Sequence, residues 1–378
     1  MSEIIVKEVQ SRRELREFIH LPAKVHKGEP GWLPPLYQDE WHLFDKKKNR
    51  SYTYADAAFF LAWKDRKPVG RIMTLINNRY NEIKNEKHGR FSFMECYNDR
   101  EIFHALITKA EEWVRNRGMM KIVGPMGFSD KDPQGFQIEG FEYPYLFTAP
   151  TNSPYMPVLI AEEGYTKEID LVNYNLPIPE SYPSVYLKAI ERYSRNGEIT
   201  ITEFKSKKEI KPIIIPVLEL MNQTFSKIYG YVPLNDAEKE EFASRYLPIL
   251  DPEFIKIAKS KNEFVGFVVA LPDMTPGIIA ARGKLFPFGI FRILKEMKKS
   301  TKLMLMLGGV REDYRGKGTD VMMAMKLIES ARKHNKKTID SHLIMEQNVR
   351  MRAECERMNG KIVKRFRIFQ KSLVDSKV

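Results

Sequence analysis

Val310-Arg-Glu-Asp-Tyr-Arg-Gly-Lys-Gly318 follows an apolar run, Lys302 to Gly309, and precedes the amphipathic pattern of Thr319 to Lys333. A strand that ends in a glycine-rich basic turn and opens a helix favours anions, because the first helical amides and the helix dipole both attract negative charge. Gly316 and Gly318 allow a close backbone approach, and the arginine and lysine beside them add charge. The stretch predicts a phosphate or pyrophosphate site, although a solvated turn is the common alternative for such a triplet alone.

The elements after this helix follow a fixed order. Lys337 to Met345 is predicted to form a strand, and Asn348 precedes a short helix from Val349 to Met358. A last strand is predicted from Lys361 to Gln370. The anion turn is therefore embedded in an alternation of strands and helices.

This order resembles the GNAT superfamily of acyl-coenzyme A N-acyltransferases. The resemblance rests on Val310, on Arg315-Gly-Lys-Gly318, and on Asn348, thirty residues after Gly318. It implies that the turn holds the coenzyme A pyrophosphate, that the preceding strand splays to bind the pantetheine arm, and that the cofactor is acetyl-CoA or a longer acyl-CoA. The cofactor-binding residues it implies are Gly309, Val310, Arg315, Gly316, Lys317, Gly318, Thr319 and Asn348.

Two positions depart from the pattern of that family. Asp320 stands where the family has glycine or alanine, and its carboxylate suits a helix N-terminus but repels a phosphate. Cys355 stands seven residues after Asn348, where many members carry the tyrosine that protonates the leaving thiolate. A thiol could donate that proton, whereas a small buried cysteine is the alternative.

The chain repeats the same order of elements in its two halves. Hairpins with Val-Gly at the same place are predicted at 58–75 and 254–271, each followed by a strand and an amphipathic helix. The resemblance implies an α/β fold class with two tandem GNAT-like domains, each a twisted central mixed sheet flanked by helices. The predicted ranges are 1–176, a proline-rich linker with a connecting helix at 177–197, and 198–378. The first copy has Cys96-Tyr-Asn-Asp-Arg-Glu101 in place of the anion turn, so it is predicted to lack a cofactor site.

The catalytic groups are less well marked. Backbone amides near Gly308 to Val310 are the candidate oxyanion donors. Strand alternation places Asp340, His342 and Glu346 on one face, which makes Glu346 and His342 the candidate general bases. Surface or structural roles are the alternatives for both, and Cys355 is the candidate acid.

Composition narrows the class of protein. The 378 residues are 43% hydrophobic and contain two cysteines in different halves, without Cys/His pairs at ligand spacing, so we expect no metal and a reducing cytoplasm. The N-terminus does not read as a signal peptide. The net charge of +13 is dispersed and no nucleic-acid motif accompanies it, so nucleic acid is an unlikely partner.

One insertion, residues 283–302, is both apolar and basic. Its phenylalanines recur at helical spacing and its lysines gather toward its end. Residues 284–299 are therefore predicted to contact an anionic membrane peripherally or to line the site of a small-molecule or lipid-like amine acceptor; the alternative is a core helix with a solvated basic end. The leading hypothesis is an acyl-CoA-dependent N-acyltransferase for such an amine; the alternative is a non-catalytic acyl-CoA-binding or scaffold protein. The acceptor and the oligomeric state are not predicted.

Overall fold

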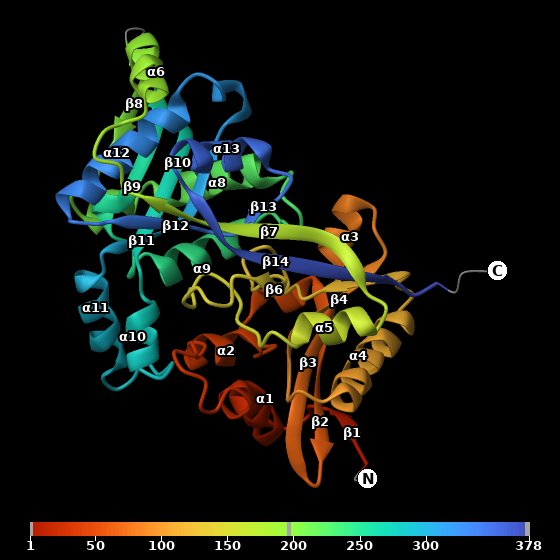
Figure 1. The fold of residues 1–378 in the computed structure, drawn as a ribbon. Coiled ribbons are helices and arrows are strands. Elements are labelled where there is room, and N and C mark those ends of the chain that lie inside the picture. The colour runs from red at the N-terminus through yellow and green to blue at the C-terminus, as the bar shows by residue number, and fades with distance from the viewer. Residues whose placement is uncertain (1–2, 195–197, 375–378) are drawn as a thin grey trace. The chain divides into compact units, whose positions relative to one another are not determined.

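The computed structural model describes residues 3–194 and 198–374, so the last three residues of the predicted 177–197 region lie outside the described part (Figure 1). The chain forms two compact units. Unit 1 consists of residues up to Val172, Met274–Glu296 and residues from Val363 onward, and unit 2 of Asn173–Asp273 and Met297–Ile362. Each unit is therefore made of separate stretches of the chain. The domain ranges predicted from the sequence, which are continuous, remain a prediction.

Unit 1 is built on a mixed sheet with the strand order β1-β2-β3-β4-β5-β14-β7. Neighbours from β1 to β4 are antiparallel, β4 and β5 are parallel, and β14 is antiparallel to β5. A short strand, β6, pairs with β14. The strands are β1 Ile5–Glu8, β2 Ala55–Lys64, β3 Lys67–Asn77, β4 His88–Cys96, β5 Lys121–Gly124, β6 Phe136–Glu139, β7 Thr166–Pro177 and β14 Lys361–Ser372.

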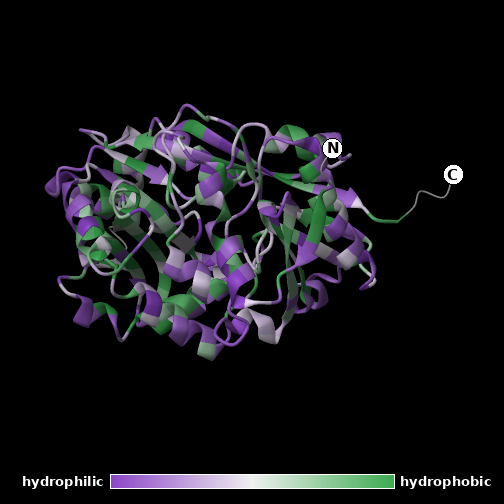
Figure 2. Ribbon diagram, turned by 90° about the horizontal axis from the view of Figure 1, so that it is seen from below, coloured by the Kyte–Doolittle hydropathy of each residue, from purple (hydrophilic) through white to green (hydrophobic). Residues whose placement is uncertain are grey.

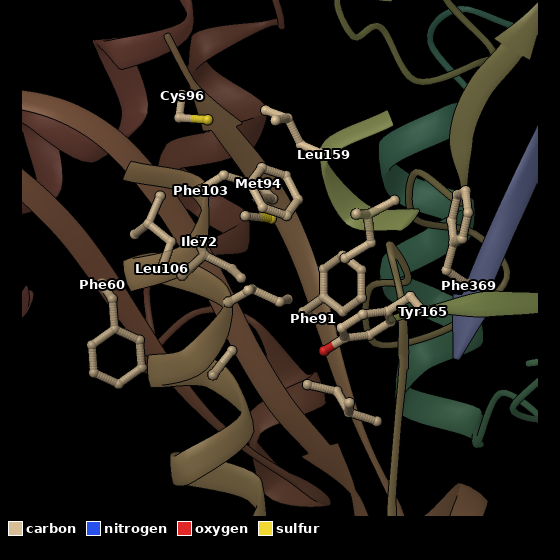
Figure 3. Packing of buried hydrophobic residues seen from close by; sticks show 14 of the residues in the cluster. Phe60, Ile72, Phe91, Met94, Cys96, Phe103, Leu106, Leu159, Tyr165 and Phe369 are labelled. Carbon is tan, nitrogen blue, oxygen red and sulfur yellow. The ribbon is translucent and has the colours of Figure 1, made fainter. Parts of the chain in front are cut away.

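The longer helices that flank this sheet, α1 and α4, each bury one apolar face, and apolar and polar residues alternate along the helical ribbons of the chain (Figure 2). Helix α4 packs on the strands through Ile102, Phe103 and Leu106, and Cys96 lies in the same core (Figure 3). The helices of unit 1 are α1 Arg12–Val25, α2 Tyr37–Leu43, the 3-10 helix η1 Arg50–Thr53, α3 Asn78–Lys84, α4 Arg100–Arg115, α5 Met156–Glu162 and α10 Thr275–Ala280. Helix α11, Gly289–Lys299, begins in unit 1 and its last residues belong to unit 2.

Unit 2 repeats this plan with the order β7-β12-β11-β10-β9-β8. Strands β11 and β12 are parallel, and the other pairs from β7 to β8 are antiparallel. The strands are β8 Ile199–Thr202, β9 Ile255–Ser260, β10 Glu263–Pro272, β11 Lys302–Val310, β12 Thr338–Ser341 and β13 Ile344–Met345, with the end of β7. The helices are α6 Ser184–Ser194, α7 Lys207–Ile210, α8 Ile214–Phe225, α9 Asp236–Tyr246, η2 Pro252–Phe254, η3 Glu312–Tyr314, α12 Thr319–Lys333 and α13 Val349–Arg357.

Matching glycines bring the central helix close to the sheet in both units. A side chain at Gly70 on β3 would place its Cβ 2.6 Å from Leu106 of α4. A side chain at Gly266 on β10 would place its Cβ 2.9 Å from Met323 of α12. The Val-Gly pairs of the two hairpins therefore share a physical cause, because a side chain at either glycine would push against the helix that packs there. The predicted fold class, with a mixed sheet and flanking helices in each half, is confirmed.

The strand predicted over 337–345 is wrong in one respect, because the structure breaks it into β12 and β13. Residues 342–343 are not in a strand, and β13 pairs with β7 rather than continuing along β11. Strict alternation therefore does not carry from Asp340 to Glu346. The fully buried Asp340 instead pairs with Lys302 at 2.8 Å and accepts a hydrogen bond from Asn175 at 2.6 Å.

Unit 1 also contains a buried polar cluster that the sequence did not indicate. The His26 ring bonds Glu29 through Nδ1 at 2.6 Å and Glu95 through Nε2 at 3.1 Å, and it stacks on Trp32. Tyr145 donates a hydrogen bond to Glu29. Burial alone would lower the pKa of His26, but its hydrogen bonds to Glu95 and Glu29 and their charges outweigh that effect and raise the pKa.

Candidate functional site

The two edges of β11 in unit 2 have different partners. Along one edge β11 pairs with β10 as far as Val310, whereas along the other it pairs with β12 only from Lys302 to Leu305. The last bond on that side runs from the His342 amide to the Leu305 carbonyl, at 2.9 Å. Beyond it the parallel strands separate, and one edge of β11 has no strand partner in the described part of the chain. This is the splay that the resemblance implied.

The register of β11 identifies which amides face the open edge. The Arg311 amide donates to the Val265 carbonyl of β10 at 2.9 Å, so Gly309 and Leu307 face β10 as well. By alternation the amides of Gly308 and Val310 point to the open side. A Cβ at Gly309 would lie 2.8 Å from Thr224 Oγ1. The absence of a side chain at Gly309 therefore serves packing, and in the described part of the chain no strand pairs with the amides of Gly308 and Val310.

The predicted anion turn lies between β11 and α12. After the 3-10 helix η3, Gly316 and Gly318 adopt positive φ angles of 74° and 75°, which favour glycine. Helix α12 begins at Thr319 with Gly318 as its N-cap, so no side-chain cap occupies the helix end. The structure gives no acceptor for the amides of Thr319 and Asp320 within the described ranges. Two amide donors and the positive end of the helix dipole therefore face this turn.

The charged side chains of the turn fall into two classes. Arg311 is held by Glu263 at 2.8 Å and by Asp313 at 2.7 Å, and these contacts raise its pKa further. Arg315 is exposed, and its Nε donates to the Val310 carbonyl at 3.1 Å. Lys317 is also exposed and lies over the Tyr314 ring at 4.8 Å. Arg315 and Lys317 are therefore the cations that an incoming anion can reach.

Acidic residues moderate the positive charge of this surface. The Asp320 carboxylate accepts a hydrogen bond from the Val321 amide at 3.0 Å, so it satisfies one of the first helical donors. Glu312 pairs with Lys227 at 3.1 Å, and this contact is the main reason that the pKa of Glu312 is lowered, with Arg315 contributing. The turn can hold an anion, but it does so beside a resident carboxylate.

Asn348 lies at the N-terminus of α13. Its side-chain oxygen accepts a hydrogen bond from the Met351 amide at 3.2 Å, which caps the helix. The role in the cofactor site that the resemblance assigns to Asn348 stays a prediction.

The three candidate catalytic residues occupy different surroundings. His342 is half-buried directly after β12, where the strands separate, and Glu346 is half-buried between β13 and α13. The Glu346 carbonyl accepts a hydrogen bond from Arg352 at 3.0 Å. Cys355 is 1% exposed, and burial raises the pKa of its thiol to about 12. His342 and Glu346 retain access to solvent, whereas Cys355 packs in the interior.

Two tyrosines near α13 were not predicted from the sequence. The Tyr174 hydroxyl donates to Glu356 at 2.8 Å and accepts from Arg352 at 3.1 Å. The Tyr186 hydroxyl donates to Glu354 at 3.0 Å, and burial followed by the Glu354 charge raises its pKa. Neither residue stands at a family motif position, so no spacing signal could have found them.

Unit 1 differs at the equivalent place. Its parallel pair, β4 and β5, also separates after Arg90 and Val123. There the Met126 amide donates to the Phe91 carbonyl at 2.8 Å, so a loop of the same unit fills the opening. At the start of α4 the Asp99 carboxylate accepts the amides of Glu101 and Ile102. The helix end that could bind an anion in unit 2 is already capped in unit 1.

Comparisons with known proteins extend this description, although no family model matches the chain. It is 26% identical over 383 aligned residues to a protein of Caulobacter vibrioides named bacterial ceramide synthase, with 98% of each chain covered. It is 27% identical to protein YghO of Escherichia coli, with 98% of this chain and 95% of that protein covered. Within the described residues no helix is long and apolar enough to cross a membrane.

Among solved structures, the chain is similar to a tandem GNAT protein from the clavulanic acid biosynthesis pathway. The TM-score is 0.55 at 13% identity, with 99% of this chain and all of that chain covered. At this identity the likeness concerns the fold, and it agrees with the repeated sheet plan of the two units and with the splayed β11. The predicted resemblance is confirmed: this chain has the tandem GNAT fold.

Proposed function

We propose that the chain is an acyl-CoA-dependent N-acyltransferase whose cofactor site lies at β11 and α12 of unit 2. The observation that carries this proposal is the junction of the open β11 edge with an uncapped helix end. Coenzyme A is an extended molecule with amide groups along its pantetheine arm and a pyrophosphate. An open strand edge followed by an anion-binding turn suits those two parts in that order.

The residues present fit this cofactor. The amides of Thr319 and Asp320, with Arg315 and Lys317, would hold the pyrophosphate. The amides of Gly308 and Val310 would bind the pantetheine arm or the acyl carbonyl. The Asp320 carboxylate would repel the pyrophosphate. The affinity for coenzyme A would therefore reflect the attraction of Arg315 and Lys317 and the repulsion of Asp320.

The bound acyl-CoA would supply an activated thioester carbonyl. The chain's own part is to place that carbonyl against an amide of the open edge, where a fixed donor stabilises negative charge on the oxygen. An amine acceptor must also lose a proton. We assign that task to His342 or Glu346, because both are only half-buried; the His342 amide bonds Leu305 at the end of the paired segment of β11, and Glu346 follows between β13 and α13. The burial and raised pKa of Cys355 disfavour it as the acid that protonates the thiolate.

We further propose that the acceptor is an amphiphilic, long-chain amine. Two observations support this acceptor class: the relative named bacterial ceramide synthase, and the exposed apolar and basic segment at 284–299. In unit 1, the filled opening beside β4 and the Asp99 cap support a unit without a cofactor site.

The alternative function is acyl-CoA binding without turnover. Asp320 and the buried Cys355 favour it, because one opposes the pyrophosphate and the other cannot readily protonate a thiolate. Calorimetry with coenzyme A, acetyl-CoA and palmitoyl-CoA, followed by mass spectrometry of a reaction with a long-chain amino alcohol, separates the two. We expect one coenzyme A per chain and an N-acylated product. Binding without product would favour the alternative, and the absence of coenzyme A binding would refute both.

A further inference from the structure

A group of large apolar side chains lies exposed on one short segment of unit 1. Phe286, Phe288, Phe291 and Leu294 expose 72%, 68%, 66% and 41% of their surfaces. Three exposed phenylalanines within six residues are unusual for a surface that faces only water. Each exposed ring forgoes the favourable free energy of burying a large apolar surface. An exposed apolar patch of this kind indicates an interaction site.

The segment has a definite structure. Helix α11 turns Ile293 and Met297 inward, and these are 4% and 7% exposed. Helix α10 lies alongside (Figure 1), and a Cβ at Gly277 of α10 would fall 2.5 Å from the Ile293 backbone. Because the buried face of α11 already holds it against α10, the phenylalanines are not required for that contact. The exposed face is left for a partner.

Basic residues share the exposed face. With 100° between successive helical residues, Phe291 and Lys295 lie one turn apart on the same side, as do Leu294 and Lys298. Lys295 and Lys298 are exposed, and exposed Lys284 precedes the phenylalanines. Apolar side chains beside lysines match a bilayer with anionic headgroups, because the rings enter the acyl boundary while the ammonium groups meet phosphate.

We infer that Phe286–Lys298 is a membrane-docking surface that binds anionic phospholipid bilayers peripherally. This inference is based on the exposure and charge of the segment, so it does not depend on the proposed acyltransferase reaction. A single short helix with its rings at the interface gives reversible attachment rather than insertion across the bilayer. The charge pattern favours phospholipid over a protein partner, because the lysines alternate with the apolar residues along one face instead of forming a rim.

The test is co-sedimentation of the full chain with vesicles of phosphatidylcholine, with and without phosphatidylglycerol. We expect binding that requires phosphatidylglycerol and weakens with salt. Phe288→Ser with Phe291→Ser should lower the partition coefficient about 100-fold, since about two-thirds of each ring is available for transfer. The matched control is Ile83→Ser with Val158→Ser, which changes exposed apolar residues on α3 and α5 and should leave binding unchanged.

A second pair tests the charge contribution. Lys295→Glu with Lys298→Glu should reduce binding to anionic vesicles about tenfold or more. Lys208→Glu with Lys211→Glu makes the same charge change on exposed residues in and after α7 and should have a smaller effect. In Phe288→Trp, tryptophan fluorescence should shift to the blue and be quenched by brominated lipid.

Three results would overturn the inference. One is a wild-type chain that does not co-sediment with anionic vesicles. Another is an equal loss of binding in the test and control variants. The third is a dimer that the serine changes dissolve while vesicle binding is absent, because a second copy of the chain would then be the partner of this surface. Since the changed side chains are exposed, the melting temperature should stay the same in every variant.

Discussion

Arg311 and Arg315, which lie between β11 and α12, provide the sharpest test of the proposed cofactor site. Arg315 is exposed and its Nε donates to the Val310 carbonyl, whereas Arg311 is held between Glu263 and Asp313. Arg315→Gln removes a charge that can reach a pyrophosphate. A charge-assisted hydrogen bond contributes about 1.5–3 kcal/mol, and solvent exposure places Arg315 near the lower end. We therefore expect coenzyme A to bind about 10- to 30-fold more weakly.

The assay is titration calorimetry of the full chain with coenzyme A at low and high salt. Arg311→Gln is the matched control, because it removes the same charge from the same turn but from a guanidinium already engaged by two carboxylates. The difference between the variants should shrink as salt rises, since exposed charges are screened. Equal affinities for wild type and Arg315→Gln, or an equal loss in both variants, would show that the pyrophosphate does not lie at this turn.

Three further predictions concern stability and reactivity. Gly309→Ala should destabilise the chain by about 1–3 kcal/mol in urea unfolding, because its Cβ would meet Thr224 Oγ1 at 2.8 Å, whereas Gly308→Ala, whose nearest neighbour is 3.8 Å away, should cost little; similar losses for both would contradict this reading of β11. Because the folded-state pKa of His26 is raised above 6.5, its stabilising contribution should be full below pH 6.5 and be lost as pH rises through the folded-state value. His26→Gln should remove that pH dependence from the urea midpoint, and an unchanged profile would argue against it. Both thiols are buried, so a thiol reagent at pH 8 should label the native chain far more slowly than the unfolded chain, and rapid native labelling would refute the assigned burial of Cys355.

The repeated order of elements and the glycine turn at 316–318 follow from the sequence pattern. Local signals decide these features: glycines with positive φ at 316 and 318, the apolar period of α12, and the Val-Gly pairs of the two hairpins. The predicted helix 319–333 has the bounds observed in the structure. Such features depend on neighbours a few residues away, and a sequence pattern therefore records them.

Which backbone and side-chain groups are available depends instead on contacts between segments that are distant in the sequence. Among the described residues no strand pairs with the amides of Gly308 and Val310, because β12 leaves β11 after Leu305. No pattern within β11 indicates where a distant strand turns away. The bonds of Tyr174 to α13 and of His26 to Glu95 likewise join residues far apart in sequence. The apolar insertion was visible in the sequence, but its helical spacing fits a core helix and a surface helix equally well. In the folded chain Ile293 is buried, whereas Phe288 and Phe291 face solvent. The sequence does not show this difference, because burial depends on what packs against a residue and not on its own hydrophobicity.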